Sequence, residues 1–160
     1  MQVHSYGYYH NANFAGQSFV GLRLKAVTFS ECNLAQADFE GAVLENCTFV
    51  GCSLYGVVFD GSTIYDSVFE KCPMIESSFV NTSMLYGGFF KSNLAFAHLD
   101  HAEFLDLEIS ESSLYKTQVN ESVFGNCEFS GTVPKLTHMT GATFDCCVFW
   151  DESSITSATI

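Results

Sequence analysis

Residues 32–51 read CNLAQ ADFEG AVLEN CTFVG, four five-residue units with a large apolar residue at the centre of each. Counting in fives from Phe14 to Phe149, the residue is Phe, Leu, Ile, Met or Val at 27 of 28 steps, and the exception is Pro134. Fourteen of the 16 Phe lie in this register. Because an α-helix repeats every 3.6 residues and a β-strand every two, a period of five indicates neither element alone.

Each unit has a second position of restricted size, two residues before the centre, where only Gln17, Leu22 and Leu107 are not small. A unit with one large and one small inward residue can bury both only if the chain turns a corner each time, so that the units form stacked coils. Eight of the 12 Gly lie two residues after a centre, which we call the corner position. Gly there suits the positive φ of a type II corner.

The centres also repeat every twenty residues, which predicts four units per coil and therefore four faces. We number the faces from residues 12–16 (face one) to residues 27–31 (face four). Phe recurs on face two at 19, 39, 59 and 79 and on face four at 29, 49, 69 and 89, with medium-sized residues between them. After Leu94, face three takes over the Phe of face two at 104, 124 and 144. This exchange conserves the volume of the core.

Segments such as residues 37–41 (ADFEG) and 92–96 (SNLAF) resemble the pentapeptide-repeat family, and the resemblance extends from about Asn11 to Asp151. It implies an all-β protein, a right-handed quadrilateral parallel β-helix of about seven coils. We expect an N-terminal cap over residues 1–11, the β-helix over 12–151, and a C-terminal cap or tail over 152–160. The Cys-containing units resemble the acidic members that protect DNA gyrase from quinolones or peptide toxins, but we expect no C-terminal dimerising helix of the kind those members have.

The composition restricts the classes of partner that the protein can bind. The chain has 18 acidic and 6 basic residues, a net charge of −12, so direct binding of nucleic acid is not expected and a basic protein partner is favoured. No apolar run of about 20 residues and no basic start followed by an apolar core are present, which predicts a cytoplasmic protein without a membrane span.

Six of the seven Cys occupy the small inward position: Cys32, Cys47, Cys52, Cys72, Cys127 and Cys147. Their spacing is that of the repeat, and a straight column cannot enclose a tetrahedral metal ion. Buried free thiols are therefore favoured over disulfides or a metal site, and no metal or cofactor is predicted. Cys146, in an outward position, is expected to be the more reactive thiol.

Two outer surfaces are candidate binding sites. Face two holds five carboxylates and no Lys or Arg: Asp38, Glu40, Asp60, Asp100 and Glu121. Face one is nearly uncharged and places apolar residues outward, and the interface candidates are Tyr55, Ile75, Phe96, Tyr115 and Leu136. Such a strip is typical of a partner or homodimer surface, although scattered surface apolar residues are an alternative. A smaller patch on face three comprises Tyr65, Leu85, Tyr86 and Leu105.

The sequence does not predict catalysis. His98, His101 and His138 lie on face two, but a convex rod without a cleft offers little desolvation for shifting a pKa. We expect no catalytic residues. Two functions remain open: an acidic rod that imitates duplex DNA and binds a type II topoisomerase, DNA gyrase or topoisomerase IV, and a protein-binding adaptor that uses the apolar strip of face one.

Overall fold

The computed structural model describes residues 2–132 and 138–150, and this part of the chain contains twelve β-strands and no helix. The strands are β1 (Tyr8–His10), β2 (Arg23–Lys25), β3 (Thr28–Ser30), β4 (Val43–Glu45), β5 (Thr48–Val50), β6 (Thr63–Glu70), β7 (Ser83–Phe90), β8 (Glu103–Ser110), β9 (Val123–Gly125), β10 (Glu128–Ser130), β11 (Thr143–Asp145) and β12 (Val148–Trp150). None of the described residues forms a helix long and apolar enough to cross a membrane.

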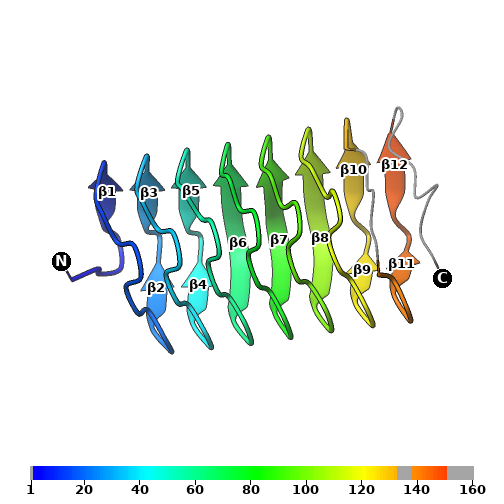
Figure 1. Ribbon diagram of the computed structural model, residues 1–160, viewed down its shortest axis with the longest axis horizontal. Coiled ribbons are helices and arrows are strands. Elements are labelled where there is room, and N and C mark those ends of the chain that lie inside the picture. Colours follow the sequence, from blue (N-terminus) through cyan, green and yellow to red (C-terminus); the bar gives the residue numbers. More distant parts are fainter. Residues whose placement is uncertain (1, 133–137, 151–160) are drawn as a thin grey trace.

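Every strand pairs in parallel with a strand twenty residues away. Tyr9 pairs with Phe29, and Phe29 with Phe49, and this register continues along face four to Phe149 in β12. Figure 1 shows the coils following one another along a single axis, from β1 at the blue end to β11 and β12 at the orange end. The predicted right-handed quadrilateral parallel β-helix of about seven coils is confirmed.

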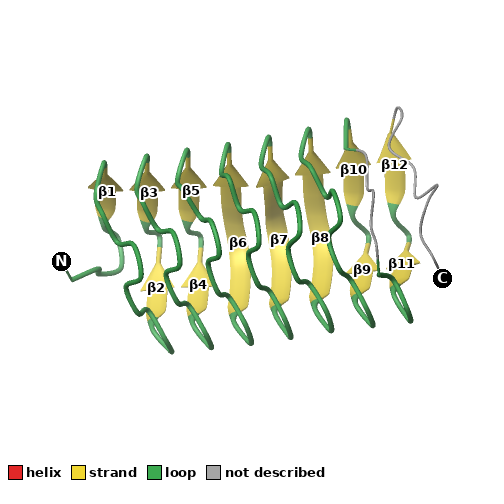
Figure 2. Cartoon of the chain, in the orientation of Figure 1, coloured by secondary structure: helices red, strands yellow, loops and turns green. Residues whose placement is uncertain are grey.

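The four faces are not equivalent. Faces three and four carry the strands, and in β6, β7 and β8 one continuous strand covers both faces. On faces one and two, the described residues of neighbouring coils form isolated parallel bridges between two-residue turns, such as Asn33 with Ser53 and Val58 with Ser78. In Figure 2 the strands therefore lie on one side of the rod and the loops on the other.

The core is built from stacked aromatic rings. On face two, Phe39 and Phe59 stack with centroids 4.9 Å apart, and on face four Phe49 and Phe69 stack at 4.8 Å. Rings of neighbouring columns meet edge to face, as Phe49 and Phe59 do at 85°, an arrangement that aromatic quadrupoles favour. Beyond Phe79 the stack moves to face three, where Phe124 and Phe144 lie 4.8 Å apart. The predicted exchange between faces is present in the core.

The first strand continues the face-four column by one coil. Tyr9 in β1 stacks on Phe29 at 5.5 Å and meets Phe14 edge to face, while Val3 is buried. Tyr6 and Tyr8 are 73% and 68% exposed, and so do not cover the core. The division into cap, β-helix and tail stays a prediction, and residues 152–160 lie outside the described residues.

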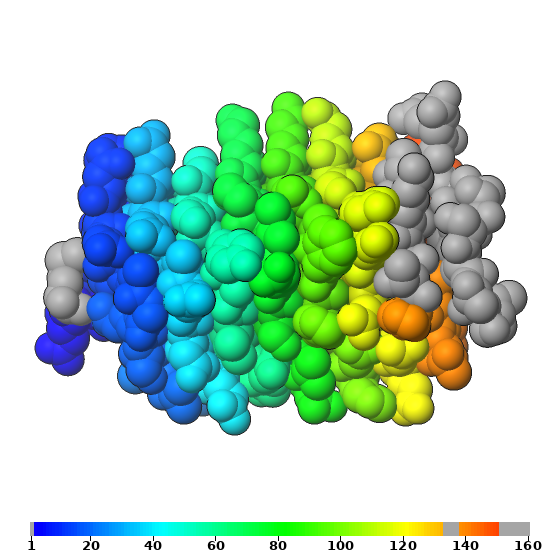
Figure 3. All heavy atoms as spheres, in the orientation of Figure 1, coloured from blue at the N-terminus to red at the C-terminus, as the bar shows by residue number. Residues whose placement is uncertain are grey.

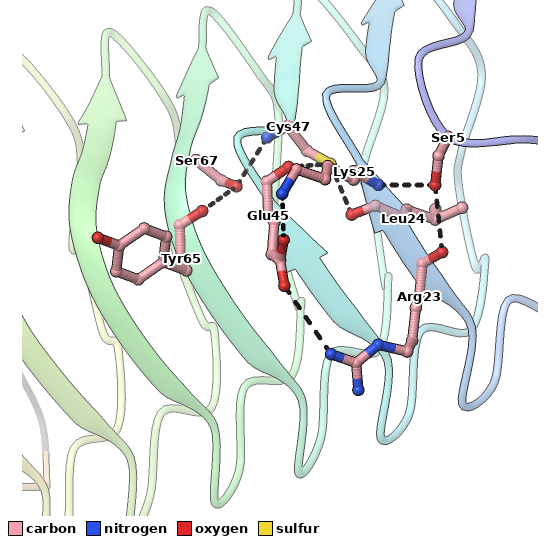
Figure 4. Close-up of polar contacts among 8 residues, drawn as sticks. All are labelled: Ser5, Arg23, Leu24, Lys25, Glu45, Cys47, Tyr65 and Ser67. Atoms are coloured by element: carbon pink, nitrogen blue, oxygen red, sulfur yellow. Dashed lines mark hydrogen bonds and ion pairs between the residues drawn. The ribbon is translucent and has the colours of Figure 1, made fainter.

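Several small inward residues donate hydrogen bonds to backbone carbonyls of the preceding coil. Cys52 Sγ donates to the carbonyl of Phe29 at 3.3 Å, and Ser92 Oγ donates to that of Phe69 at 3.1 Å. Figure 4 shows the same arrangement for Cys47, whose thiol points to the Leu24 carbonyl and whose backbone N–H donates to Ser67 Oγ. These buried thiols and hydroxyls thus find acceptors of their own and link adjacent coils, which gives the Cys columns a structural role.

Every described corner residue from Tyr6 to Cys146 has a positive φ, and most of these residues are not Gly. Gly87 and Gly88 also have positive φ, outside the corner register. A Cβ at Gly87 would lie 2.0 Å from the Ser67 carbonyl oxygen, and one at Gly88 would lie 1.9 Å from that of Glu108. Only Gly fits at these two positions of β7, where the strand passes from face three to face four.

Candidate protein-binding surfaces

On face two, the two central carboxylates are hydrogen-bonded within the protein. Asp60 Oδ1 accepts from Ser78 Oγ at 2.5 Å and from the backbone N–H of Val80 at 3.0 Å. Asp100 Oδ1 accepts from both the backbone and the side-chain amide of Asn120, at 2.9 and 2.6 Å. Both carboxylates therefore join adjacent coils, a role that the sequence spacing alone did not indicate.

The other face-two acids differ in the contacts that their carboxylates make within the protein. Asp38 Oδ1 accepts from the backbone N–H of Glu40 at 2.9 Å, while the Glu40 side chain itself is exposed. Glu121 is also exposed, 3.2 Å from the ring nitrogen of His101. Glu40 and Glu121 are thus the face-two acids most available to a partner.

In the apolar strip of face one, a Lys side chain lies against two aromatic rings. Phe96 and Tyr115 are 44% and 43% exposed, and their rings meet at 84° with centroids 5.7 Å apart. The ammonium group of Lys116 lies 5.6 Å from the Phe96 ring and 5.5 Å from the Tyr115 ring. This is the geometry of a cation–π interaction.

The remaining members of the strip are less uniform. Tyr55 is 43% exposed, and its hydroxyl donates to Glu76 at 2.6 Å. This hydrogen bond, together with the charge of Glu76, raises the pKa of Tyr55. Ile75 is half-buried, and Leu136 lies outside the described residues. The structure therefore brings Phe96 and Tyr115 into contact, and pairs Tyr55 with a carboxylate.

Face three presents a second aromatic pair, which sequence reasoning noted only as a minor patch. Tyr65 and Tyr86 are 46% and 45% exposed, and their rings meet at 83° with centroids 5.6 Å apart. Asp66 follows Tyr65 in the chain, and Asp106 occupies the corner position one coil beyond Tyr86. Among the described residues, no Lys or Arg lies over these two rings.

A shallow depression of about 370 Å³ adjoins this pair at Gly87, the residue that follows Tyr86 in β7. Asp106, Glu108 and Glu128 line it, together with Leu107. Glu108 and Glu128 pair directly across neighbouring strands, and like charges in that position repel each other. No ion pair with a base is present for these three acids within the described residues, so the depression is strongly anionic.

The basic residues form contacts with other side chains of the same protein. Near the N-terminal end of face three, Lys25 and Arg23 both contact Glu45, at 3.1 and 3.8 Å, as Figure 4 shows. The hydrogen bond with Glu45 raises the pKa of Lys25. Lys71 contacts Glu70 at 3.1 Å and Lys91 contacts Glu111 at 3.5 Å. With Lys116 on its aromatic pair, each of the five bases in the described residues has an acidic or aromatic neighbour.

The face of the rod that Figure 3 shows has no deep hollow. His98 Nδ1 lies 3.8 Å from Asp100 Oδ2, and Asp100 is the carboxylate already hydrogen-bonded to the next coil. His101 contacts Glu121. The two histidines thus contact different carboxylates rather than a common centre. In the described residues, no three His, Cys, Asp or Glu side chains are grouped so as to hold a metal ion.

The fold defines the class of the protein as a β-solenoid. Residues 22–86 match the family described as "Pentapeptide repeat region", and the same five-residue register continues on both sides of this segment. This part of the chain is therefore a pentapeptide-repeat region. No match was found among curated protein sequences.

Solved structures give the same result for the fold. A trypsin-treated form of QnrB1, a plasmid-mediated fluoroquinolone resistance protein, is 21% identical with a TM-score of 0.59, over 97% of this chain and 78% of that one. Full-length QnrB1 is 17% identical with a TM-score of 0.48, over 91% and 94% of the two chains. HetL, involved in heterocyst differentiation regulation in the cyanobacterium Nostoc, is 12% identical with a TM-score of 0.28, over 90% and 86%. Only the first similarity is strong enough to support the fold, and none of these matches indicates a catalytic family.

Proposed function

We propose that this protein is a non-enzymatic binding protein, an acidic rod that imitates duplex DNA and binds a type II topoisomerase such as DNA gyrase or topoisomerase IV. The observation that carries the proposal is the placement of charge. All 16 acids in the described residues lie at least partly at the surface, while the bases already have intramolecular neighbours. The outer surface therefore attracts a basic partner.

The carboxylates are spaced nearly as closely as the phosphates of DNA, while the net charge is less dense, about one per 3 Å of rod. Coils about 4.8 Å apart give seven coils a length of roughly 34 Å, so the carboxylates occur about every 2 Å, compared with one phosphate charge per roughly 1.7 Å of duplex. The resemblance of the Cys-containing units to gyrase-protecting pentapeptide-repeat proteins supports the same partner. The anionic surface would then occupy a basic groove that normally holds DNA.

The test is capture of purified gyrase by the immobilised protein. Glu40→Lys with Glu121→Lys should abolish capture, and binding by the wild type should weaken steeply as salt rises, because exposed charges are screened. Asp60 and Asp100 are left unchanged, because reversing their charge would also remove the hydrogen bonds between coils. Asp60→Asn serves as the control, since it removes one charge and retains a hydrogen-bond acceptor.

A second candidate function, an adaptor or homodimer that binds through face one, is favoured by the exposed Phe96 and Tyr115. For this function, Tyr55→Ser with Ile75→Ser and Phe96→Ser should abolish capture, because buried aromatic anchors carry most of the energy of an interface. Salt-resistant binding that is lost in this triple variant would contradict DNA mimicry. Binding that is unchanged in the triple variant would contradict the adaptor.

A further inference from the structure

The Tyr65–Tyr86 pair and the Phe96–Tyr115 pair have nearly the same geometry on opposite faces. Their ring centroids lie 5.6 and 5.7 Å apart, and their planes meet at 83° and 84°. All four rings are between 43% and 46% exposed. The two pairs therefore offer aromatic surfaces of similar size and shape, and the difference between them lies in the charge beside the rings.

The residue that decides this difference directly follows a tyrosine in both pairs. Lys116 follows Tyr115 in the chain, and it lies one coil beyond Phe96 in the corner column. Asp66 follows Tyr65 and lies one coil before Tyr86 in the corner column of face three. The cation over the first pair is thus replaced by a carboxylate at the second.

The surroundings of the second pair extend this reversal of charge. Asp106 lies on the other side of Tyr86, so that this ring has a carboxylate in the coil before it and another in the coil after it. The depression that begins at Gly87 adds Glu108 and Glu128. Leu85 and Leu105, both half-buried, provide apolar surface in the same column as Tyr65. The result is an aromatic pair within an anionic surface.

From this comparison we infer that the Tyr65–Tyr86 pair with Asp66, Asp106 and the Gly87 depression binds an arginine or lysine side chain from a basic segment of a partner protein. The guanidinium or ammonium group stacks on the tyrosine rings, as Lys116 does on Phe96 and Tyr115. The flanking carboxylates supply the opposite charge, and the apolar stem of the side chain lies on Leu85 or Leu105. This surface is separate from the face-two acids of the proposed function.

A peptide of alternating Arg and Ser, about nine residues long and labelled with fluorescein, serves as the probe, and binding is measured by fluorescence anisotropy. Tyr65→Thr with Tyr86→Asn should weaken binding about tenfold, since the cation loses both rings. Thr retains the preference for a strand in β6, and Asn tolerates the positive φ at residue 86. Tyr55→Thr is the matched control on face one, and it should leave the affinity unchanged. Thermal unfolding of each variant verifies that it is folded.

An exchange of charge tests the comparison directly. Asp66→Lys gives the tyrosine pair an intramolecular cation like Lys116 and should abolish peptide binding. Glu40→Lys changes the net charge by the same amount on another face and should weaken binding no more than about twofold, because exposed charges at a distance are screened. Lys116→Asp should create a second binding site, seen as a stoichiometry of two peptides per protein.

Three outcomes would overturn the inference. Wild-type affinity in the double tyrosine variant would remove the aromatic pair from the site. Equal weakening by Asp66→Lys and Glu40→Lys would indicate attraction to net charge alone. No measurable binding of the Arg peptide by the wild type at low salt would exclude a basic segment as the occupant. Capture of gyrase through Glu40 and Glu121 is a separate readout, so either idea can fail without the other.

Discussion

The inward positions and the corner positions of the coil recur with the same period but follow different rules. Described inward centres are confined to a few large apolar types, and most of them are completely buried. Described corners all have positive φ, yet they include Phe96, Lys91 and Glu111 as well as Gly. Coil closure thus imposes the corner backbone on almost any side chain, while packing restricts the interior. The corners therefore contribute varied side chains to the outer surface, among them Tyr86, Phe96 and Lys116.

The thiols provide the largest expected difference between the two kinds of position. Cys47 and Cys52 are inward and completely buried, while Cys146 is an exposed corner residue. Labelling of a buried thiol requires the coil to open, at a cost of several kcal/mol. We therefore expect maleimide to modify Cys146 in the native protein roughly a thousandfold faster than the buried thiols, or more. Intact mass and peptide mapping over time measure both rates.

The pH dependence of Cys146 labelling is a further part of this prediction. A hydrogen bond to Asp145 and the charge of that carboxylate raise the pKa of Cys146. Because the thiolate is the reactive form, labelling should be slow near pH 7 and should still be rising at about pH 9. Asp145→Asn lowers this pKa and should accelerate labelling near pH 7. Rapid native labelling of Cys47 or Cys52 would contradict their inward placement.

Truncation of a core ring tests the interior more strongly than any corner substitution. Phe59 stacks between Phe39 and Phe79 at 4.9 Å on both sides and is completely buried. Phe59→Ala leaves a cavity in the middle of this column, and the free energy of unfolding should fall by about 3 to 5 kcal/mol. Urea unfolding measures the change. A loss below about 1 kcal/mol would indicate that the column collapses around the cavity, and that packing is less restrictive than the sequence suggests.

The fold could be predicted because the interior is periodic. The five-residue register determines which residues are buried, the twenty-residue repeat determines the four faces, and the exchange of Phe at residue 104 is visible in the sequence. The corner conformation was predicted only where Gly marks it. Tyr86 and Phe96 show that coil geometry overrides local preference at the other corners.

The binding surfaces were less predictable, because they depend on contacts between coils. The spacing places Asp60 and Asp100 outward, but it does not reveal that Ser78 and Asn120 in the next coil donate hydrogen bonds to them. Likewise, Tyr65 and Tyr86 lie in different columns, and their contact requires the diagonal packing of two coils. A search of the sequence for two aromatic residues about one coil apart, the first followed directly by a charged residue, would have found this pair.

Glycine at a corner provides the smallest effect and the sharpest test of the corner rule. Gly41 has a φ of 61°, and a Cβ at this position would meet no atom within 4 Å. Gly41→Ala therefore creates no clash. The left-handed conformation costs an L-residue about 1 kcal/mol, and the lower conformational entropy of the unfolded chain offsets about half of this cost, so the free energy of unfolding should fall by about 0.5 kcal/mol.

The reverse substitution completes this last prediction. Ala26 is a corner residue with a φ of 50°, and Ala26→Gly should raise the free energy of unfolding by about 0.5 kcal/mol. The gain should equal the loss in Gly41→Ala, because the left-handed cost and the entropy of the unfolded chain both act with the opposite sign. Urea unfolding of both variants gives the two changes under the same conditions. Equal stability of Gly41→Ala and the wild type would mean that stacking of the coils removes the conformational cost, and that the eight corner glycines are present for another reason.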